Sequence, residues 1–259
     1  MSTVLFERSG GVAVITLNRP ESMNAVDPAT LRLLGERFQE FDHDDELRVA
    51  ILTGAGDKAF CAGADLKKYA EREYYGIEEL WNPSRQNRPG GRNLQVTKPV
   101  IAAINGFCLA GGQEIALACD MRIASDTASF GSPEVRWSLL HGYGALQLPH
   151  TVSLAVAMDM LLTGERIDAK RAYEVGLVSR VVPPAELMPT ARRMAEKISE
   201  HGPLATKLVK ELALRGPHLH PEDAIAYRNS ISALLRLTDD AKEGPRAFAQ
   251  KRKPQFKGR

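Results

Sequence analysis

Residues 104–120 read INGFCLAGGQEIALACD, and this stretch decides the fold class. A turn at Asn105 separates two short apolar runs, and Gly111 and Gly112 precede a third apolar run with helical spacing. That helical run carries one carboxylate, Glu114, in its first turn. The positive end of a helix dipole favours an acidic side chain there, so a structural role accounts for Glu114 as readily as a catalytic one.

The same order of segments occurs three times along the chain. An apolar strand is followed by a tight turn, a second short segment with a phenylalanine, and a small residue at which a helix begins. The three units read AILTGAGDKAFCAGADLKKYA, IAAINGFCLAGGQEIALACD and MRIASDTASFGSPEVRW. Their phenylalanines, Phe60, Phe107 and Phe130, lie 47 (107 − 60) and 23 (130 − 107) residues apart, so the repeat is not strict. The pattern predicts stacked ββα units, each of which buries apolar surface of its neighbour.

The segments before these units predict a hairpin and a helix. Two β-rich runs lie on either side of Ser9, Gly10 and Gly11, and they predict a β-hairpin over 4–17. Apolar residues at helical spacing predict a helix over 28–41.

The second half of the chain changes character. Five helical patterns follow Gly144: LAVAMDMLLTG, AKRAYEVGL, ELMPTARRMAEKISE, ATKLVKELAL and PEDAIAYRNSISALLRL. We therefore predict an αβ body over 1–185, which carries the site, and a helical region over 186–259. Within the body, residues 72–93 read REYYGIEELWNPSRQNRPGGRN, which predicts a helix followed by a loop.

Bulk composition excludes several classes of function. The 259 residues are 44% hydrophobic and 25% charged, and the net charge of +2 gives no general attraction for nucleic acid or anionic membranes. No apolar run approaches the roughly 20 residues of a membrane span, and the first residues lack the layout of a signal peptide. Cys61, Cys108 and Cys119 lack the spacing of metal ligands, and we interpret Cys61 and Cys108 as small packing residues. We expect a cytoplasmic protein without structural disulfides.

Two of the predicted helix starts have the features of an oxyanion hole. Small residues surround Gly63 in the first unit and Gly111 in the second. A helix start presents N–H groups without intrahelical partners, together with the positive end of the helix dipole. Two such starts from stacked units can direct two main-chain N–H groups at one oxygen. The same small residues also permit tight packing of a helix on a strand, so both explanations stay open.

The polar candidates near these starts each have a structural alternative. Ser132, Pro133 and Glu134 have the order of a capped helix opening, but Glu134 and Glu114 can also face one space and move protons there. Lys58 and Lys67 lie on either side of the first glycine motif, where solvated lysines are common. The sequence HGYG at 141–144 predicts a loop that lines a pocket, in which His141 is either a structural residue or part of the site. Asp65 is expected to cap or buttress its own turn.

Five stretches, taken together, resemble the enoyl-CoA hydratase/isomerase (crotonase) superfamily. They read DKAFCAGADLK, PVIAAINGFCLAGGQEIALACDMRIA, ASFGSPE, LLTGERIDAKRAYEVGLVSRVV and DDAKEGPRAFAQKRKPQFKG, in that family's order. The resemblance implies an α/β fold, a crotonase-like spiral of stacked ββα units with a helical C-terminal region. It also implies a homo-oligomer, a trimer or a dimer of trimers, that acts on acyl-CoA thioesters with no metal and no cofactor besides the coenzyme A of the substrate.

The resemblance also implies roles for individual residues. The main-chain N–H groups of Ala64 and Gly111 would hold the thioester oxygen, and Glu114 and Glu134, 20 positions apart (134 − 114), would handle protons during hydration of an enoyl-CoA. The residues expected to contact CoA or substrate are Lys58, Ala62, Leu66, Lys67 and Gly142. The candidates for the acyl pocket are Tyr69, Tyr74, Tyr75, Trp81, His141 and Tyr143.

Three departures from the usual hydratase pattern keep other reactions open. His141 stands where hydratases usually carry proline, Tyr143 and Ala145 follow in the same segment, and Glu21 occupies a position that is often basic. The segment from 66 to 97 is also long. The alternatives are isomerisation, ring hydration, dehydration of a carnitinyl-type substrate, C–C bond cleavage, or a non-catalytic binding role. Retention of both glutamates and both glycine segments favours hydration.

Overall fold

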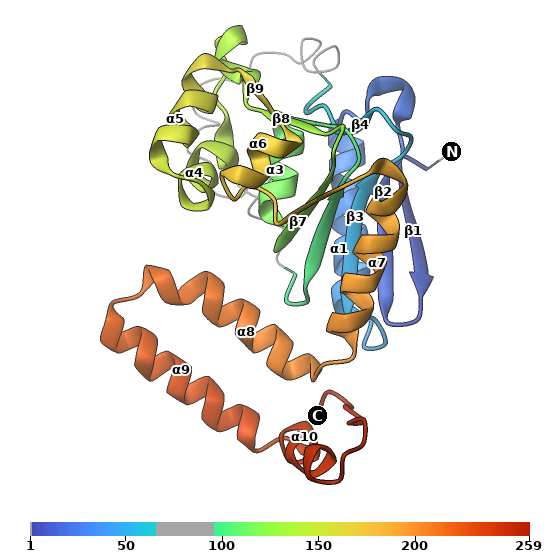
Figure 1. The fold of residues 1–259 in the computed structure, drawn as a ribbon, viewed down its shortest axis with the longest axis vertical. Helices are drawn as coiled ribbons and strands as arrows, with labels where there is room; N and C mark the ends of the chain where they lie inside the picture. The colour runs from blue at the N-terminus through green and yellow to red at the C-terminus, as the bar shows by residue number, and fades with distance from the viewer. Residues whose placement is uncertain (1, 66–95) are drawn as a thin grey trace.

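The computed structural model describes residues 2–65 and 96–259, which form two sheets and a set of covering helices (Figure 1). The larger sheet has six strands in the order β1-β2-β3-β5-β7-β10. These strands are β1 (Val4–Ser9), β2 (Val12–Leu17), β3 (Val49–Gly54), β5 (Val100–Ile104), β7 (Met121–Ser125) and β10 (Arg180–Val182). β1 and β2 form the predicted hairpin, and every other pair in this sheet is parallel.

A smaller sheet of four strands receives the second strand of each ββα unit. Its strands are β4 (Ala59–Cys61), β6 (Phe107–Leu109), β8 (Ser129–Gly131) and β9 (Arg166–Asp168), in that order. Each ββα unit therefore contributes its first strand to the larger sheet and its second strand to the smaller one; the pairs are β3 and β4, β5 and β6, and β7 and β8. The phenylalanines Phe60 and Phe130 are buried in the core, whereas Phe107 is half-buried. The predicted stacking of ββα units is therefore confirmed.

Helices cover both faces of the larger sheet. The helix α1 (Pro28–His43) is capped by Asp27, whose carboxylate accepts from Thr30 N at 2.8 Å, and it buries Leu34, Phe38 and Phe41 against one face. The helix α7 (Pro184–Ser199) packs on the opposite face in a separate apolar cluster. Its contributions to that cluster are Leu187, Ala191 and Ala195, which meet Val49, Ile51, Ile101 and Ile123 of the strands.

The remaining helices of the described residues are η1 (Pro20–Ser22), α3 (Gly111–Ala118), η4 (Pro133–Trp137), α4 (Gly142–Thr151), α5 (Leu154–Thr163), α6 (Ala169–Glu174), α8 (Pro203–Arg215), η5 (Gly216–His218), α9 (Pro221–Arg236) and α10 (Asp239–Ala249). Among them, α3, η4, α5, α6, α8 and α9 follow predicted helical patterns. The interpretation of residues 141–144 as a loop is wrong, because Gly142 begins α4. The sequence also gave no sign of α10, which contains Gly244 and Pro245 and is capped by Thr238.

The C-terminal helices extend away from the body (Figure 1). The division at residue 185 stays a prediction, since α7 crosses it and packs on the sheet, while α8, α9 and α10 lie beyond. No helix within the described ranges is long and apolar enough to cross a membrane. The helix and loop predicted over 72–93 lie outside the described residues.

Candidate active site

The first helix-start segment is held beside residues 23–26. Val26 N donates to Gly63 O at 2.8 Å and Asp65 N donates to Val26 O at 3.0 Å, which gives a parallel bridge between Val26 and Ala64. Because hydrogen-bonding groups of successive residues point to opposite sides of an extended chain, this pairing turns the N–H of Ala64 away from residue 26. The amide of Asn24 donates to Ala55 O and Ala59 O, which ties residues 23–26 to the turn between β3 and β4.

The second helix start lies directly against the first. Ala110, the residue before α3, has φ 53° and ψ −129°, a strained conformation that a side chain rarely adopts. Its N–H donates to Gly131 O at 2.9 Å, and the next residue, Gly111, begins the helix. A Cβ placed on Gly111 would lie 3.7 Å from Ala64 N, and one placed on Gly63 would lie 3.3 Å from Gly111 N. The structure therefore brings the two predicted main-chain nitrogens together.

The two glutamates converge on the first turn of α4. Oε1 of Glu114 accepts a hydrogen bond from Gly144 N at 3.2 Å, and it lies 3.9 Å from Nδ1 of His141. Oε1 of Glu134 is hydrogen-bonded to the same Nδ1. Both side chains are largely buried, with 16% of the Glu114 side chain and 12% of the Glu134 side chain exposed. Two carboxylates so close to one nitrogen form a site suited to holding and moving protons.

Sequence reasoning did not find the part that Gly144 plays. His141 is 3% exposed, and a Cβ on Gly144 would lie 1.7 Å from its Nε2. Only glycine fits at 144 while the imidazole occupies this place. A Cβ on Gly142 would lie 3.4 Å from Oε1 of Glu114, so Gly142 borders the same carboxylate. The spacing of glycines in HGYG was the available signal, but it does not reveal an imidazole folded back over the turn.

Two further polar residues support the site in ways that the sequence did not predict. Ser132 does not cap η4 with its side chain; its hydroxyl donates instead to the buried amide of Gln113, one residue before Glu114, at 2.8 Å. The carboxylate of Asp65, which was expected to cap or buttress its own turn, also pairs with Arg19 at 2.9 Å. Arg19 also donates to Ala25 O at 2.7 Å, so it joins the two chain segments behind Ala64.

The buried guanidinium of Arg122 binds main-chain carbonyls at the C-terminal end of α3. Arg122 donates to Cys119 O at 2.8 Å, to Ala116 O at 3.4 Å and to Leu177 O at 2.9 Å. Burial lowers the pKa of its guanidinium below the usual value. Burial also raises the pKa of Cys61 and of Cys119 to about 12, and all three cysteines are free and buried, as small packing residues would be.

The structure describes only some of the other residues predicted to contact CoA or the acyl group. Lys58 is exposed at the turn before β4, and its carbonyl accepts from Phe107 N at 3.0 Å, while Ala62 lies half-buried just before Gly63. Glu21 is exposed in η1. Leu66, Lys67, Tyr69, Tyr74, Tyr75 and Trp81 lie outside the described residues. The part of the chain that is described contains no group of three metal-ligating side chains.

Tyr143 faces a cavity of about 840 Å³ between the body and the C-terminal helices. Leu117 of α3 lines the same cavity, so α3 runs from the paired nitrogens at its start to this space at its end. The other apolar lining residues are Val96, Leu204, Leu208, Leu214, Leu234 and Leu235. At 1.5 Å per residue, the eight residues of α3 separate the two ends by roughly 10 Å.

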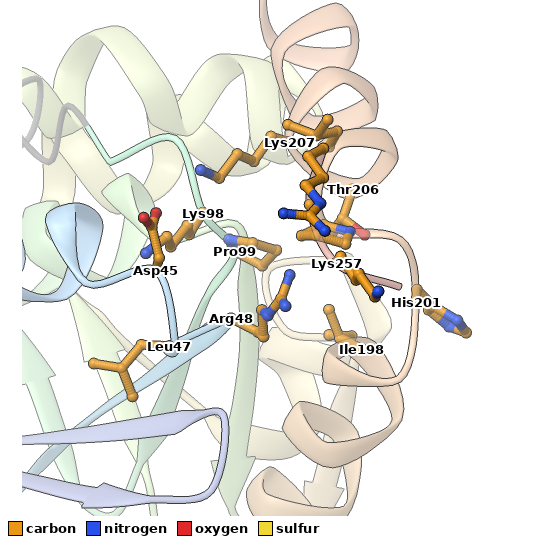
Figure 2. A pocket seen from close by; sticks show the side chains of 14 residues that line it. Asp45, Leu47, Arg48, Lys98, Pro99, Ile198, His201, Thr206, Lys207 and Lys257 are labelled. Atoms are coloured by element: carbon orange, nitrogen blue, oxygen red, sulfur yellow. The ribbon is translucent and has the colours of Figure 1, made fainter. Parts of the chain in front are cut away.

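A second pocket of about 280 Å³ shares Leu204 and Lys207 with this cavity (Figure 2). Its charged lining residues are Asp45, Arg48, Lys98, Lys207, Lys257 and Arg259. Lys98 is fixed by donating to Phe41 O and Asp44 O, while His201 points outward in Figure 2. None of the residues that line this pocket is a predicted site residue.

Known proteins match the chain along its whole length. The family model described as enoyl-CoA hydratase/isomerase matches residues 7–259. The chain is 45% identical to (E)-benzylidenesuccinyl-CoA hydratase of Thauera aromatica, over 98% of this chain and 99% of that protein. It is 40% identical to short-chain-enoyl-CoA hydratase of Clostridium acetobutylicum, over 100% and 99%.

A solved structure matches the fold equally well. The crystal structure of enoyl-CoA hydratase from Bacillus anthracis superposes with a TM-score of 0.91 at 36% identity, and each chain is covered completely. The resemblance found in the five sequence stretches and the crotonase-like spiral are both confirmed. The chain belongs to the enoyl-CoA hydratase/isomerase family.

Proposed function

We propose that this chain is an enoyl-CoA hydratase, a hydro-lyase that adds water across the 2,3 double bond of an enoyl-CoA thioester. The observation that carries the proposal is the convergence of two largely buried carboxylates, Glu114 and Glu134, on one turn of α4. An isomerase needs to move one proton between two carbons, whereas hydration needs both a bound water and a proton donor. Relatives named as hydratases at 40–45% identity support the same choice.

The thioester oxygen is held by the N–H groups of Ala64 and Gly111. These two nitrogens lie side by side, and Gly111 stands at the positive end of α3. As the β-carbon accepts oxygen, negative charge moves to the thioester oxygen and forms an enolate. Donors that are already in place stabilise that charge without reorganisation, which is the largest contribution in many enzymes of this kind.

Water and protons are handled by the two glutamates. Each has one oxygen engaged by the first turn of α4, because Gly144 N bonds Oε1 of Glu114 and His141 bonds Oε1 of Glu134. The opposite oxygens remain for one water molecule. The water oxygen bonds to the β-carbon as one of its protons passes to the Glu134 carboxylate, and Glu134 then delivers that proton to the α-carbon on the same face. The elements of one water are added, and no resident cofactor is required because the thioester already acidifies the α-carbon.

We infer that the acyl group is functionalised, branched or cyclic rather than a short straight chain. The family resemblance implies that the tyrosine-rich segment forms the wall of the acyl pocket, with more bulk and more polar groups than a linear alkyl chain requires. The cavity of about 840 Å³ beside Tyr143 offers room for such a group. The relative from Thauera aromatica, named for an aryl-substituted dicarboxylic thioester, agrees with this inference, and the short-chain relative from Clostridium acetobutylicum supplies the alternative.

The C-terminal helices support assembly into a homo-oligomer, a trimer or a dimer of trimers. Large apolar side chains are exposed on α8, α9 and the segment after them: Val209, Leu214, Ile225, Leu234 and Leu237. Exposed apolar groups gathered on one part of a molecule mark a surface that a partner covers. Sedimentation of the purified protein measures the state directly, and a monomer at micromolar concentration would contradict this part of the proposal.

The decisive experiment is a panel of thioesters. Crotonyl-CoA, longer straight-chain, branched, cyclic and aryl-substituted enoyl-CoA compounds are incubated with the protein, and product mass and regiochemistry are recorded. Products heavier by one water establish hydration, whereas products of unchanged mass with a shifted double bond establish isomerisation. If kcat/KM is highest for crotonyl-CoA and falls smoothly with chain length, the inference about the acyl group is wrong while hydration stands.

A further inference from the structure

His141 is the residue in the site whose role the family's usual chemistry leaves unexplained. The family's hydratases usually carry proline at this position, and proline has no side-chain donor. Here the imidazole is 3% exposed, with Nδ1 hydrogen-bonded to Oε1 of Glu134 and 3.9 Å from Oε1 of Glu114. Burial of a polar ring between two carboxylates is costly unless its hydrogen bonds are made, so its presence requires a reason.

The surroundings of the ring fix its orientation and its tautomer. An ionised carboxylate only accepts hydrogen bonds, so Nδ1 must carry the proton that reaches Glu134. Nε2 is buried against Gly144 and has no hydrogen-bond partner among the described residues. Nδ1 is therefore the ring nitrogen that makes the hydrogen bond of His141 in this site. The imidazole thus packs against Gly144 on its Nε2 side and is hydrogen-bonded to Glu134 on its Nδ1 side.

The two carboxylate oxygens of Glu134 have different surroundings. Oε2 is buried and also lacks a partner among the described atoms, although Oε1 of the same carboxylate is engaged by His141. An unpaired buried oxygen of this kind marks a place where a water or a reacting group is received. The hydrogen bond from His141 therefore distinguishes the two oxygens of Glu134 and prevents the carboxylate from rotating.

We propose that His141 is a positioning residue that holds Oε1 of Glu134 and so presents Oε2 to the reacting water and the α-carbon. This inference rests on the proposed hydration and on the part of Glu134 in it. His141 itself does not touch the reacting atoms. A carboxylate displaced by about 1 Å can cost about 100-fold in rate, so loss of this restraint lowers kcat rather than the affinity for substrate.

The test compares variants that keep or remove the donor. His141→Asn places an amide N–H near the position of Nδ1, while His141→Leu removes the donor at similar volume. His141→Pro removes it with the residue usual in the family, and the backbone φ of −75° at His141 accommodates proline. The matched control is His150→Leu at the other end of α4, where the histidine is exposed.

We expect His141→Leu and His141→Pro each to lower kcat roughly 10–100-fold with KM within about three-fold. His141→Asn should stay within about five-fold of the wild type, and His150→Leu should be unchanged. Unfolding temperatures of all variants are measured alongside, and His141→Pro serves if His141→Leu does not fold. In a Glu134→Gln background, His141→Leu should cause no further loss, because His141 acts through Glu134.

The inference is overturned if His141→Leu or His141→Pro keeps wild-type kcat, or if His141→Asn loses as much as they do. It is also overturned if the loss falls on KM alone, or if it persists undiminished in the Glu134→Gln background. Failure of the proposed function has a different signature, since the wild type would then give no product heavier by one water with any thioester of the panel. Normal hydration by Glu134→Gln would instead refute the role of Glu134. A wild-type rate for His141→Leu beside an inactive Glu134→Gln refutes only the role of His141.

Discussion

A methyl group on Gly63 would lie 2.7 Å from the Cβ of Ala110, so the segment at Gly63 and the start of α3 touch with no room for a side chain between them. Gly63 also has φ +103°, a conformation that L-residues rarely adopt. Ala110 in turn has φ 53°, so the strained backbone of Ala110 meets a glycine at this contact. Strain of this kind persists where a function requires it, and here it sets two N–H groups beside each other.

Gly63→Ala should therefore remove most activity. The added methyl group must push the two segments apart, which separates the N–H groups of Ala64 and Gly111 that we propose hold the enolate. Loss of one such donor typically costs about 100–1,000-fold in kcat. Hydration kinetics with the best thioester of the panel measure the effect. Gly35→Ala in α1, where nothing lies within 4 Å of the new methyl group, is the control and should leave kcat unchanged. A normal kcat for Gly63→Ala would refute the paired-donor arrangement.

Replacing Lys58 and Lys67 together with glutamate should weaken binding of the CoA portion. Lys58 is exposed beside the turn that precedes β4, and opposite charges attract its ammonium to the phosphates of CoA. The affinity of the variant should also depend less on salt, because exposed ion pairs are screened. Titration calorimetry with an acyl-CoA at two salt concentrations measures both effects. Lys170→Glu with Lys197→Glu makes the same charge change on α6 and α7; if that pair weakens binding equally, Lys58 and Lys67 make no specific contact.

The three cysteines should be unreactive in the folded protein. Burial raises the pKa of Cys61 and Cys119 to about 12, and that of Cys108 well above its usual value near 9. Thiolate, the reactive form, is thus suppressed at pH 8, and a thiol reagent should label no cysteine until denaturant is added.

The raised pKa values of the buried cysteines also make the free energy of unfolding depend on pH. Between about pH 9 and pH 12 the unfolded chain loses thiol protons that the folded chain keeps, so the free energy of unfolding falls as pH rises above 9. Urea titrations at pH 8, 9 and 10 with a triple Cys→Ala variant for comparison isolate this contribution. A slope that is the same in both proteins would contradict it.

Arg122→Leu should lower the free energy of unfolding rather than impair the reaction itself. The substitution removes the donor of the Cys119 and Leu177 carbonyls in a buried place, while Ala116 O keeps its bond from Cys119 N, and the loss costs about 3 kcal/mol by the usual range for such losses. Urea denaturation gives the free energy of unfolding. Arg171→Leu on the exposed face of α6 is the matched control. An unchanged midpoint for Arg122→Leu would mean that water reaches these carbonyls.

The sequence predicted what depends on local pattern. Alternating apolar runs and small residues indicated the ββα units, since each strand and turn is specified within a few residues. The pairing of Ala64 with Gly111 and of Glu114 with Glu134 came from the family resemblance, and the structure brings both pairs together. Contacts between distant segments were not predictable: the hydroxyl of Ser132 meets Gln113 only because β8 lies beside β6.

The bond between His141 and Glu134 shows the same limit at the site. Glu134 and His141 lie in neighbouring segments of the chain. Local rules predicted a capped helix at Glu134 and a loop at His141. Their contact depends on η4 ending at Ser138, whose φ of 55° reverses the chain, and on a glycine at 144 that leaves space for the ring. The reversal at Ser138 has no signature in composition or spacing, and the glycines of HGYG do not reveal that Gly144 leaves space for a ring. The tyrosine-rich segment stays a prediction, because it lies outside the described residues.

The most direct test of the central claim is a cycle of Glu114→Gln, Glu134→Gln and the double variant, with single-turnover hydration rates measured for each. Glutamine keeps the size of the side chain and removes its ability to take a proton, so each single variant should lose about 100–10,000-fold in rate with its fold intact. Because both carboxylates act on one water, the double variant should lose less than the product of the two single losses. A near-normal hydration rate for either single variant would contradict the two-glutamate mechanism.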